Sequence, residues 1–130
     1  MKINKLIDFK FLKDILYYDG PIISLGLTND NLPVFEIWCD ENKENNINIY
    51  AYVFITHNDF QLFINFYKSY FNVIKDSLEI VLFKYNGEAF DFQIVSNEKF
   101  ITNYGPQDDS DSCLDLINFR NHYLKFNEKE

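Results

Sequence analysis

The side chains that most often carry out catalysis are few in this chain. There are two histidines, His57 at an expected helix start and His122 near the end of another expected helix, and both positions favour a structural role. The two cysteines, Cys39 and Cys113, both have acidic neighbours in the sequence. Negative charge raises the pKa of a thiol, so neither cysteine is expected to be a good nucleophile. We predict that the chain is not an enzyme, with a small enzyme of unfamiliar site as the weaker alternative.

Ligand motifs for metals, nucleotides and other cofactors are also missing. The segment Asp109-Ser110-Asp111 has the spacing of a calcium loop start, but it lacks the glycine and the glutamate that complete such a loop. The glycines are isolated, so no phosphate-binding loop is present. Neither cysteine belongs to a Cys-x-x-Cys pair, which argues against zinc. We expect no metal and no cofactor, and we expect reduced cysteines.

Acidic side chains are the chemistry that remains. The 130 residues contain 20 Asp and Glu against 12 Lys and Arg, which gives a net charge of −8. This balance disfavours direct binding of nucleic acid, since phosphate recognition needs cations. The acids gather in two clusters, which we predict to contact a protein partner: Asp40, Glu41 and Glu44 in one, and Asp108, Asp109, Asp111 and Asp115 in the other. The competing interpretation is that both are solvated, helix-capping segments.

Aromatic residues make up 18% of the chain and predict an aromatic-rich core. Exposed tyrosines are common anchors at protein interfaces. The candidates for this role are Tyr17, Tyr18, Tyr67, Tyr70 and Tyr104.

Runs of β-branched and aromatic residues between turn signals predict an antiparallel meander. The expected strands are Ile22–Thr28, Leu32–Cys39, Ile47–Ile55, Leu78–Tyr85 and Glu88–Val95. Asn86-Gly87 predicts a type I′ hairpin turn between the last two, with Phe90, Phe92 and Ile94 on one face of the final strand. The first segment fits a short helix near Leu6–Leu16 and also a strand through Ile15–Tyr18.

Capping residues predict where helices begin. Thr56 and Asp59 form a capping-box pattern ahead of a helix with Phe60, Phe63, Ile64 and Tyr67 at helical spacing. A last helix, capped by Asp111 or Ser112, is expected to bury Leu114, Ile117 and Leu124. Ser96–Tyr104 fits either a short helix or an irregular segment. The fold class is therefore α+β, an antiparallel sheet of about five to six strands with two to three helices packed on it.

The length corresponds to one domain, which we assign to residues 1–130. The first residues contain no apolar signal-peptide segment, and no apolar run is long enough to span a bilayer. We therefore expect a cytoplasmic protein with no membrane contact. The oligomeric state is left open.

Two resemblances add to this interpretation. Tyr17-Tyr18-Asp19-Gly20-Pro21-Ile22-Ile23, followed by a strand ending in Trp38-Cys39-Asp40-Glu41, resembles the opening of a family of small bacterial domains of unassigned activity, over residues 12–85. The size, acidity, aromatic content and lack of catalytic residues are similar to those of immunity proteins against the toxins of interbacterial competition and contact-dependent growth inhibition. That similarity implies an inhibitor or antitoxin that occludes the active site of a basic toxin domain, for example a nuclease. The alternative is a phage or host-defence accessory module that mimics the charge of nucleic acid.

Overall fold

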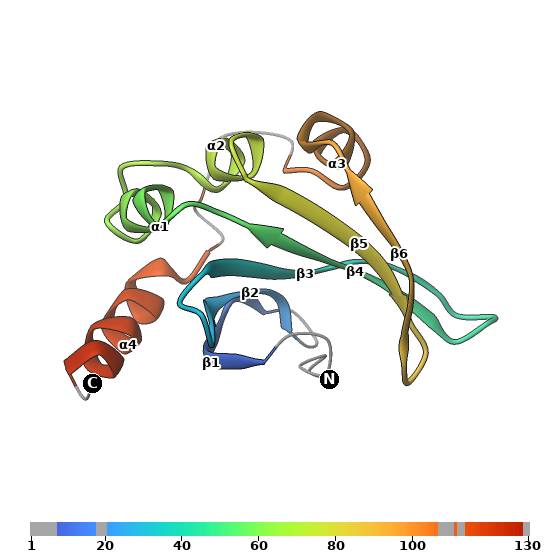
Figure 1. Ribbon diagram of the computed structural model, residues 1–130, viewed down its shortest axis with the longest axis horizontal. Coiled ribbons are helices and arrows are strands. Elements are labelled where there is room, and N and C mark those ends of the chain that lie inside the picture. Colours follow the sequence, from blue (N-terminus) through green and yellow to red (C-terminus); the bar gives the residue numbers. More distant parts are fainter. Residues whose placement is uncertain (1–7, 18–20, 107–110, 112–113, 129–130) are drawn as a thin grey trace.

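The computed structural model describes residues 8–17, 21–106, 111 and 114–128 of the chain. These residues form six strands and four helices, and the strands make one antiparallel sheet in the order β1-β2-β3-β4-β5-β6 (Figure 1). The strands are β1 (Phe9–Tyr17), β2 (Pro21–Thr28), β3 (Pro33–Asn42), β4 (Ile47–Phe54), β5 (Glu79–Tyr85) and β6 (Ala89–Val95). The helices are α1 (His57–Ile64), α2 (Tyr70–Lys75), α3 (Asn97–Tyr104) and α4 (Leu116–Glu128). The predicted α+β class and the meander are confirmed.

The two segments that the sequence left ambiguous are now assigned. The first is strand β1, which pairs with β2, and the stretch after β6 is helix α3, whose N-cap Ser96 accepts a hydrogen bond from the backbone N–H of Lys99. Within the parts of the chain that the structure describes, no helix combines the length and the apolarity needed to cross a membrane.

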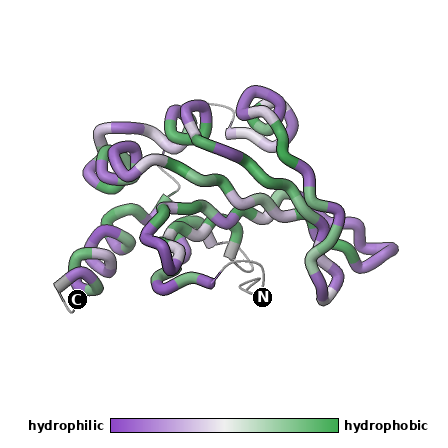
Figure 2. Tube along the Cα trace, viewed as in Figure 1, coloured by the Kyte–Doolittle hydropathy of each residue, from purple (hydrophilic) through white to green (hydrophobic). Residues whose placement is uncertain are grey.

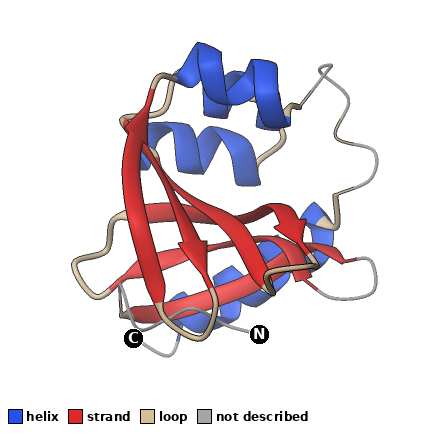
Figure 3. Ribbon diagram, turned by 90° about the vertical axis from the view of Figure 1, so that its right-hand side faces the viewer, coloured by secondary structure: helices blue, strands red, loops and turns tan. Residues whose placement is uncertain are grey.

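The main core lies between the sheet and the helices. It joins side chains of β1 to β5 with rings from every helix, including Phe60 and Phe63 of α1, Tyr70 of α2, Phe100 of α3 and Phe119 of α4. The sheet is strongly curved, and its helices lie against it (Figure 3). Helix α4 contacts β1 and α1, so the C-terminal helix is fixed to the first strand.

A smaller cluster occupies the other face of the sheet. It consists of Val34, Tyr52, Phe83 and Tyr85, with Phe9 of β1 packed edge-on against Tyr52. Strands β1 and β2 approach each other closely at Gly26, where a Cβ would overlap the carbonyl oxygen of Phe11. Glycine is the residue that permits such contact.

The β5–β6 hairpin forms at the predicted place, but its turn is not type I′. Gly87 has a φ of 110°, whereas Asn86 is not among the residues with positive φ. The N–H of Asn86 instead donates to the carbonyl of Glu88, so the turn spans three residues.

A bulge in β6 corrects a second expectation. The pairing shifts between Leu82 and Lys84, and the bulged residue Asp91 has a φ of 56°. As a result Phe90 pairs with Lys84. The neighbours of Lys84 on β5, Phe83 and Tyr85, belong to the smaller cluster, and side chains alternate between the two faces of a strand. Lys84 and its partner Phe90 therefore face away from that cluster. Phe92 lies on the cluster's side, where it contacts Phe83. Phe90, Phe92 and Ile94, which the sequence placed on one face of β6, therefore do not share one face.

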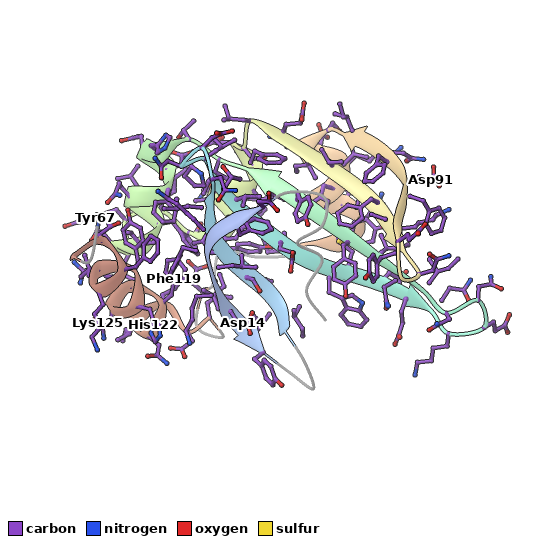
Figure 4. All side chains as sticks on the ribbon, turned by 60° about the horizontal axis from the view of Figure 1, so that its bottom comes forward. Asp14, Tyr67, Asp91, Phe119, His122 and Lys125 are labelled. Carbon is purple, nitrogen blue, oxygen red and sulfur yellow. The ribbon has the colours of Figure 1, made fainter. Side chains whose placement is uncertain are left out.

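The predicted buried face of the last helix is wrong at Ile117 and Leu124, whereas Leu114, which precedes the helix, is partly buried and packs against the main core. Helix α4 buries Leu116, Phe119 and Tyr123, while Ile117 and Leu124 are exposed. The helix begins later than expected, at Leu116. The carboxylate of Asp115 accepts the N–H of Asn118 and caps the helix, a role that the sequence assigned to Asp111 or Ser112. Ser112 lies outside the described residues. Figure 4 shows Phe119 on the side of α4 that faces the strands, with His122 and Lys125 on the outer side.

Candidate protein-binding surfaces

The loop that connects α1 to α2 is tightly hydrogen-bonded. The carbonyl of Leu62 accepts the N–H groups of both Tyr67 and Lys68, at 2.8 and 3.2 Å. Asn65 donates its side-chain amide to the carbonyl of Gln61, and its Oδ1 accepts a bond from Nε of Arg120 on α4. These contacts fix the loop against α1 and α4.

Phe66 in this loop has a φ of 68°, the left-handed region that favours glycine. A non-glycine residue there costs roughly 1–2 kcal/mol. More than half of the residue, 56%, is also exposed. An exposed aromatic in an unfavourable backbone conformation suggests a role other than stability.

The loop and the start of α4 enclose a groove with a volume of about 480 Å³. We call it the α1–α4 groove and define it by its lining residues, Phe66, Tyr67, Lys68, Ser69, Asp111, Leu114, Asp115, Leu116 and Ile117. Three of its large apolar side chains are solvent-exposed, with 82% of Tyr67, 70% of Ile117 and 56% of Phe66 accessible. Figure 4 shows Tyr67 at the same end of the molecule as α4.

Two of the predicted contact residues lie in this groove. Both carboxylate oxygens of Asp111 accept the N–H of Tyr70, at 3.1 and 3.2 Å, so Asp111 adds to the cap that Ser69 makes at the start of α2. Asp115 is exposed, and its own N–H donates to the carbonyl of Ile15 on β1. Asp108 and Asp109 fall outside the described part of the chain. Asp115 is thus the described carboxylate of this cluster that is best placed to meet a partner.

Lys68 also lines the groove, but its charge is already engaged. Its Nζ lies 3.0 Å from Asp59 and 2.8 Å from Asp76. The hydrogen bond to Asp76 is the main reason why the pKa of Lys68 is raised, and the same bond lowers the pKa of Asp76. The predicted cap at Thr56 is confirmed, since its hydroxyl accepts the N–H of Asp59, while the Asp59 carboxylate binds Lys68.

The other acidic cluster lies on the β3–β4 hairpin. Asp40, Glu41 and Glu44 are exposed there, and the ladder continues to the pair Asn42 and Ile47, so the hairpin is well formed. Glu41 has a loose contact of 3.9 Å with Lys43. These side chains line a shallow recess of about 560 Å³ together with Ile47, Ile49 and Lys84.

The structure does not bring the two clusters together. The β3–β4 hairpin extends at one end of the long axis of the molecule, while α1 and α4 lie at the other (Figure 1). The hairpin tip is also strongly hydrophilic (Figure 2). A single continuous negative face formed by both clusters is therefore not what this fold presents.

Both histidines are exposed, and Cys39 is half-buried. His57 is exposed, with Nε2 2.6 Å from the carbonyl of Asn31, and His122 is exposed on α4. Burial, and then the charge of Asp40, raise the pKa of Cys39 from 9.0 to about 12. Cys113 lies outside the described residues. Among the residues that are described, no group of His, Cys, Asp and Glu is arranged to hold a metal ion.

The predicted tyrosine anchors divide into three groups. Tyr17 and Tyr67 are exposed, Tyr70 is buried in the core, and Tyr104 is half-buried. Tyr18 is not among the described residues. Sequence reasoning missed Phe66 and Ile117 as surface residues. The spacing of apolar residues gave no signal for either of them, because it placed Ile117 on the buried side of its helix.

Comparison of the chain with protein-family models, with curated proteins and with solved structures found no match. Its function is therefore inferred from the chemistry of its own surfaces. These offer an apolar groove with an acidic border at one end and an acidic hairpin at the other. Both are features of binding surfaces.

Proposed function

We propose that this chain is a cytoplasmic inhibitor of the immunity-protein type, which binds a basic toxin domain, such as a nuclease, and occludes its active site. The observation that carries the proposal is the exposure of Asp40, Glu41 and Glu44 at one end of the described structure and of Asp115 at the other. Among the described residues of the hairpin cluster, the cationic contact is the one between Glu41 and Lys43, at 3.9 Å. In the groove, the charge of Lys68 is shared between Asp59 and Asp76.

Such a charge distribution favours a basic partner for a kinetic reason. The chain carries a net charge of −8, and a negative surface raises the rate of encounter with a positive one. Electrostatic attraction of this kind weakens with salt, because the Debye length falls to about 8 Å at physiological ionic strength. The candidates for direct contact are the two acidic clusters, Asp40, Glu41 and Glu44 on the hairpin and Asp108, Asp109, Asp111 and Asp115 in the second cluster.

The test begins with capture of the partner. A tagged copy of the chain, expressed in its source cell, is purified at low salt, and the bound protein is identified by mass spectrometry. We expect a basic protein that reconstitutes as a stable complex from purified components and loses its activity on binding. A host defence complex that binds nucleic acid would instead support the charge-mimic function.

Association kinetics of the reconstituted complex then test the electrostatic mechanism. Reversal of the exposed carboxylates to lysine should slow association by tenfold or more and reduce its dependence on salt. Asp111 is left unchanged in this series because its carboxylate caps α2. An association rate that is the same for the wild type and for the charge-reversed chain, at every salt concentration, would show that the acidic clusters are not the contact surface.

A further inference from the structure

We infer that the partner docks in the α1–α4 groove, where it inserts an apolar side chain flanked by Lys or Arg, and that the β3–β4 hairpin makes no direct contact. This inference rests on the proposed function and specifies which of the two acidic ends is the interface. The two ends lie at opposite ends of the long axis (Figure 1), and the inference assigns the interface to one of them.

The two ends differ in what they offer beyond charge. Binding energy at protein interfaces is concentrated in a few large side chains that become desolvated, and aromatic residues lead among them. In the groove Phe66, Tyr67 and Ile117 are exposed together. In the hairpin recess the apolar residues are Ile47 and Ile49, both already half-buried. The groove alone supplies apolar anchors that a partner could newly cover.

Charge complementarity sets the chemistry of the occupant. Asp115 is exposed at the groove, and Asp111 lies beside it, while the one cation of the lining, Lys68, is bound by Asp59 and Asp76. Arg120 donates to Asn65 and does not line the groove. The carboxylate of Asp115 accepts hydrogen bonds from Asn118, but its negative charge remains exposed at the groove. An acidic partner segment would be repelled by this charge, whereas a basic segment would be attracted to it.

The groove is also built in advance of binding. The hydrogen bonds of Leu62, Asn65 and Arg120 hold the loop in place, so ordering it costs little when the partner arrives. The same bonds keep Phe66 in its left-handed conformation with the ring exposed. A preformed apolar groove of this kind favours a short anchor segment as its occupant.

The experiment uses a defined probe and does not depend on capture of the natural partner. The isotope-labelled chain is titrated with a peptide in which Leu-Phe stands between two pairs of lysines, and backbone amide shifts are followed by NMR. One control peptide has Ala-Ala in place of Leu-Phe, and a second has glutamate in place of every lysine. We expect saturable shifts at Phe66, Tyr67 and Ile117 with the first peptide, and at least tenfold weaker binding with either control.

Matched variants distinguish specific binding in the groove from non-specific binding to exposed apolar side chains elsewhere. Ile117→Ser and Tyr67→Ser should each weaken the peptide by about tenfold or more. Ile94→Ser and Tyr17→Ser remove side chains of similar exposure, 72% and 68%, from strands β6 and β1, and should change the affinity by less than twofold. All four positions are exposed, so each variant should fold.

Each outcome bears on the inference. Shifts confined to the hairpin, equal binding of the Ala-Ala peptide, equal effects of all four substitutions, or no shift at all would overturn the assignment of the groove. None of these would remove the proposed function, which is decided by capture and inhibition of a basic protein. If a partner is captured and only hairpin substitutions weaken it, the function stands and the docking surface is the other end.

Discussion

The Nζ of Lys68 lies 3.0 Å from Oδ1 of Asp59, with only 19% and 11% of the two side chains exposed. The same Nζ lies 2.8 Å from Oδ2 of Asp76, which is half exposed. Asp59 stands in the first turn of α1 and Asp76 caps the end of α2. One lysine thus connects the α1–α2 loop to both of the helices that flank it.

Replacement of Lys68 with methionine should lower the free energy of unfolding by about 2–3 kcal/mol, because Asp59 would remain enclosed without a cation. The measurement is urea unfolding at neutral pH. Asp76→Asn is the matched control, and it should cost less than about 1 kcal/mol because that carboxylate is well solvated. Equal midpoints for the wild type and Lys68→Met would show that the ion pair contributes nothing to the fold.

Helix α4 offers a test of which side faces the core. Phe119 is fully buried and packs against Phe11 and Phe60, so Phe119→Ala should destabilise the fold by about 3–5 kcal/mol. Ile117→Ala, at an exposed position two residues away, should stay within about 0.5 kcal/mol of the wild type. Thermal unfolding of both variants checks this prediction. The opposite order of effects would mean that α4 packs through the face the sequence suggested.

Phe66 should behave as a residue that lowers stability while it serves binding. Phe66→Gly relieves the strain of the left-handed backbone, but glycine also makes the unfolded chain more flexible. The free energy of unfolding should therefore stay unchanged or rise by up to about 1 kcal/mol. The same substitution should weaken the lysine-flanked Leu-Phe peptide. Tyr67→Gly is the control, since Tyr67 is not among the residues with positive φ, and it should not stabilise the fold. A clear loss of stability in Phe66→Gly would contradict this account.

Cys39 should resist alkylation while the protein is folded. Its pKa rises from 9.0 to about 12, chiefly through burial, so the reactive thiolate should be on the order of a thousandfold rarer at pH 8 than in the unfolded chain. In a Cys113→Ala background, iodoacetamide labelling with and without urea measures the difference. The sign for stability follows: the folded state keeps this proton, so its contribution is complete below pH 9.0 and is lost as the pH rises towards about 12. Rapid labelling of the native protein at pH 8 would refute the shift.

Most of the fold was predictable because its signals are local. Turn residues separate the strands, and side-chain capping by Thr56 starts helix α1. The position of the β5–β6 hairpin also came from its Asn-Gly pair. These features depend on neighbouring residues and need no knowledge of the tertiary structure.

The errors arose where tertiary packing decides the outcome. Nothing local marks the bulge at Asp91, which places Phe90 and Phe92 on different faces of β6. The face of α4 depends on β1, more than 100 residues earlier in the sequence, whose Phe11 receives Phe119. The groove likewise joins residues of a loop and a helix about fifty positions apart, so its apolar anchors could not be found from sequence spacing.

The bulge at Asp91 also affects how copies of this chain meet one another. Strand β6 ends the sheet, and its Phe92 and Ile94 are exposed, which is the composition that lets sheets join edge to edge. The bulge interrupts the strand, and the ion pair of Asp91 with Lys84, at 2.9 Å, places two charges at the interruption. A neighbouring strand could align with only the last few residues of β6. The fold can therefore leave an apolar margin open to solvent and still resist growth into fibrils.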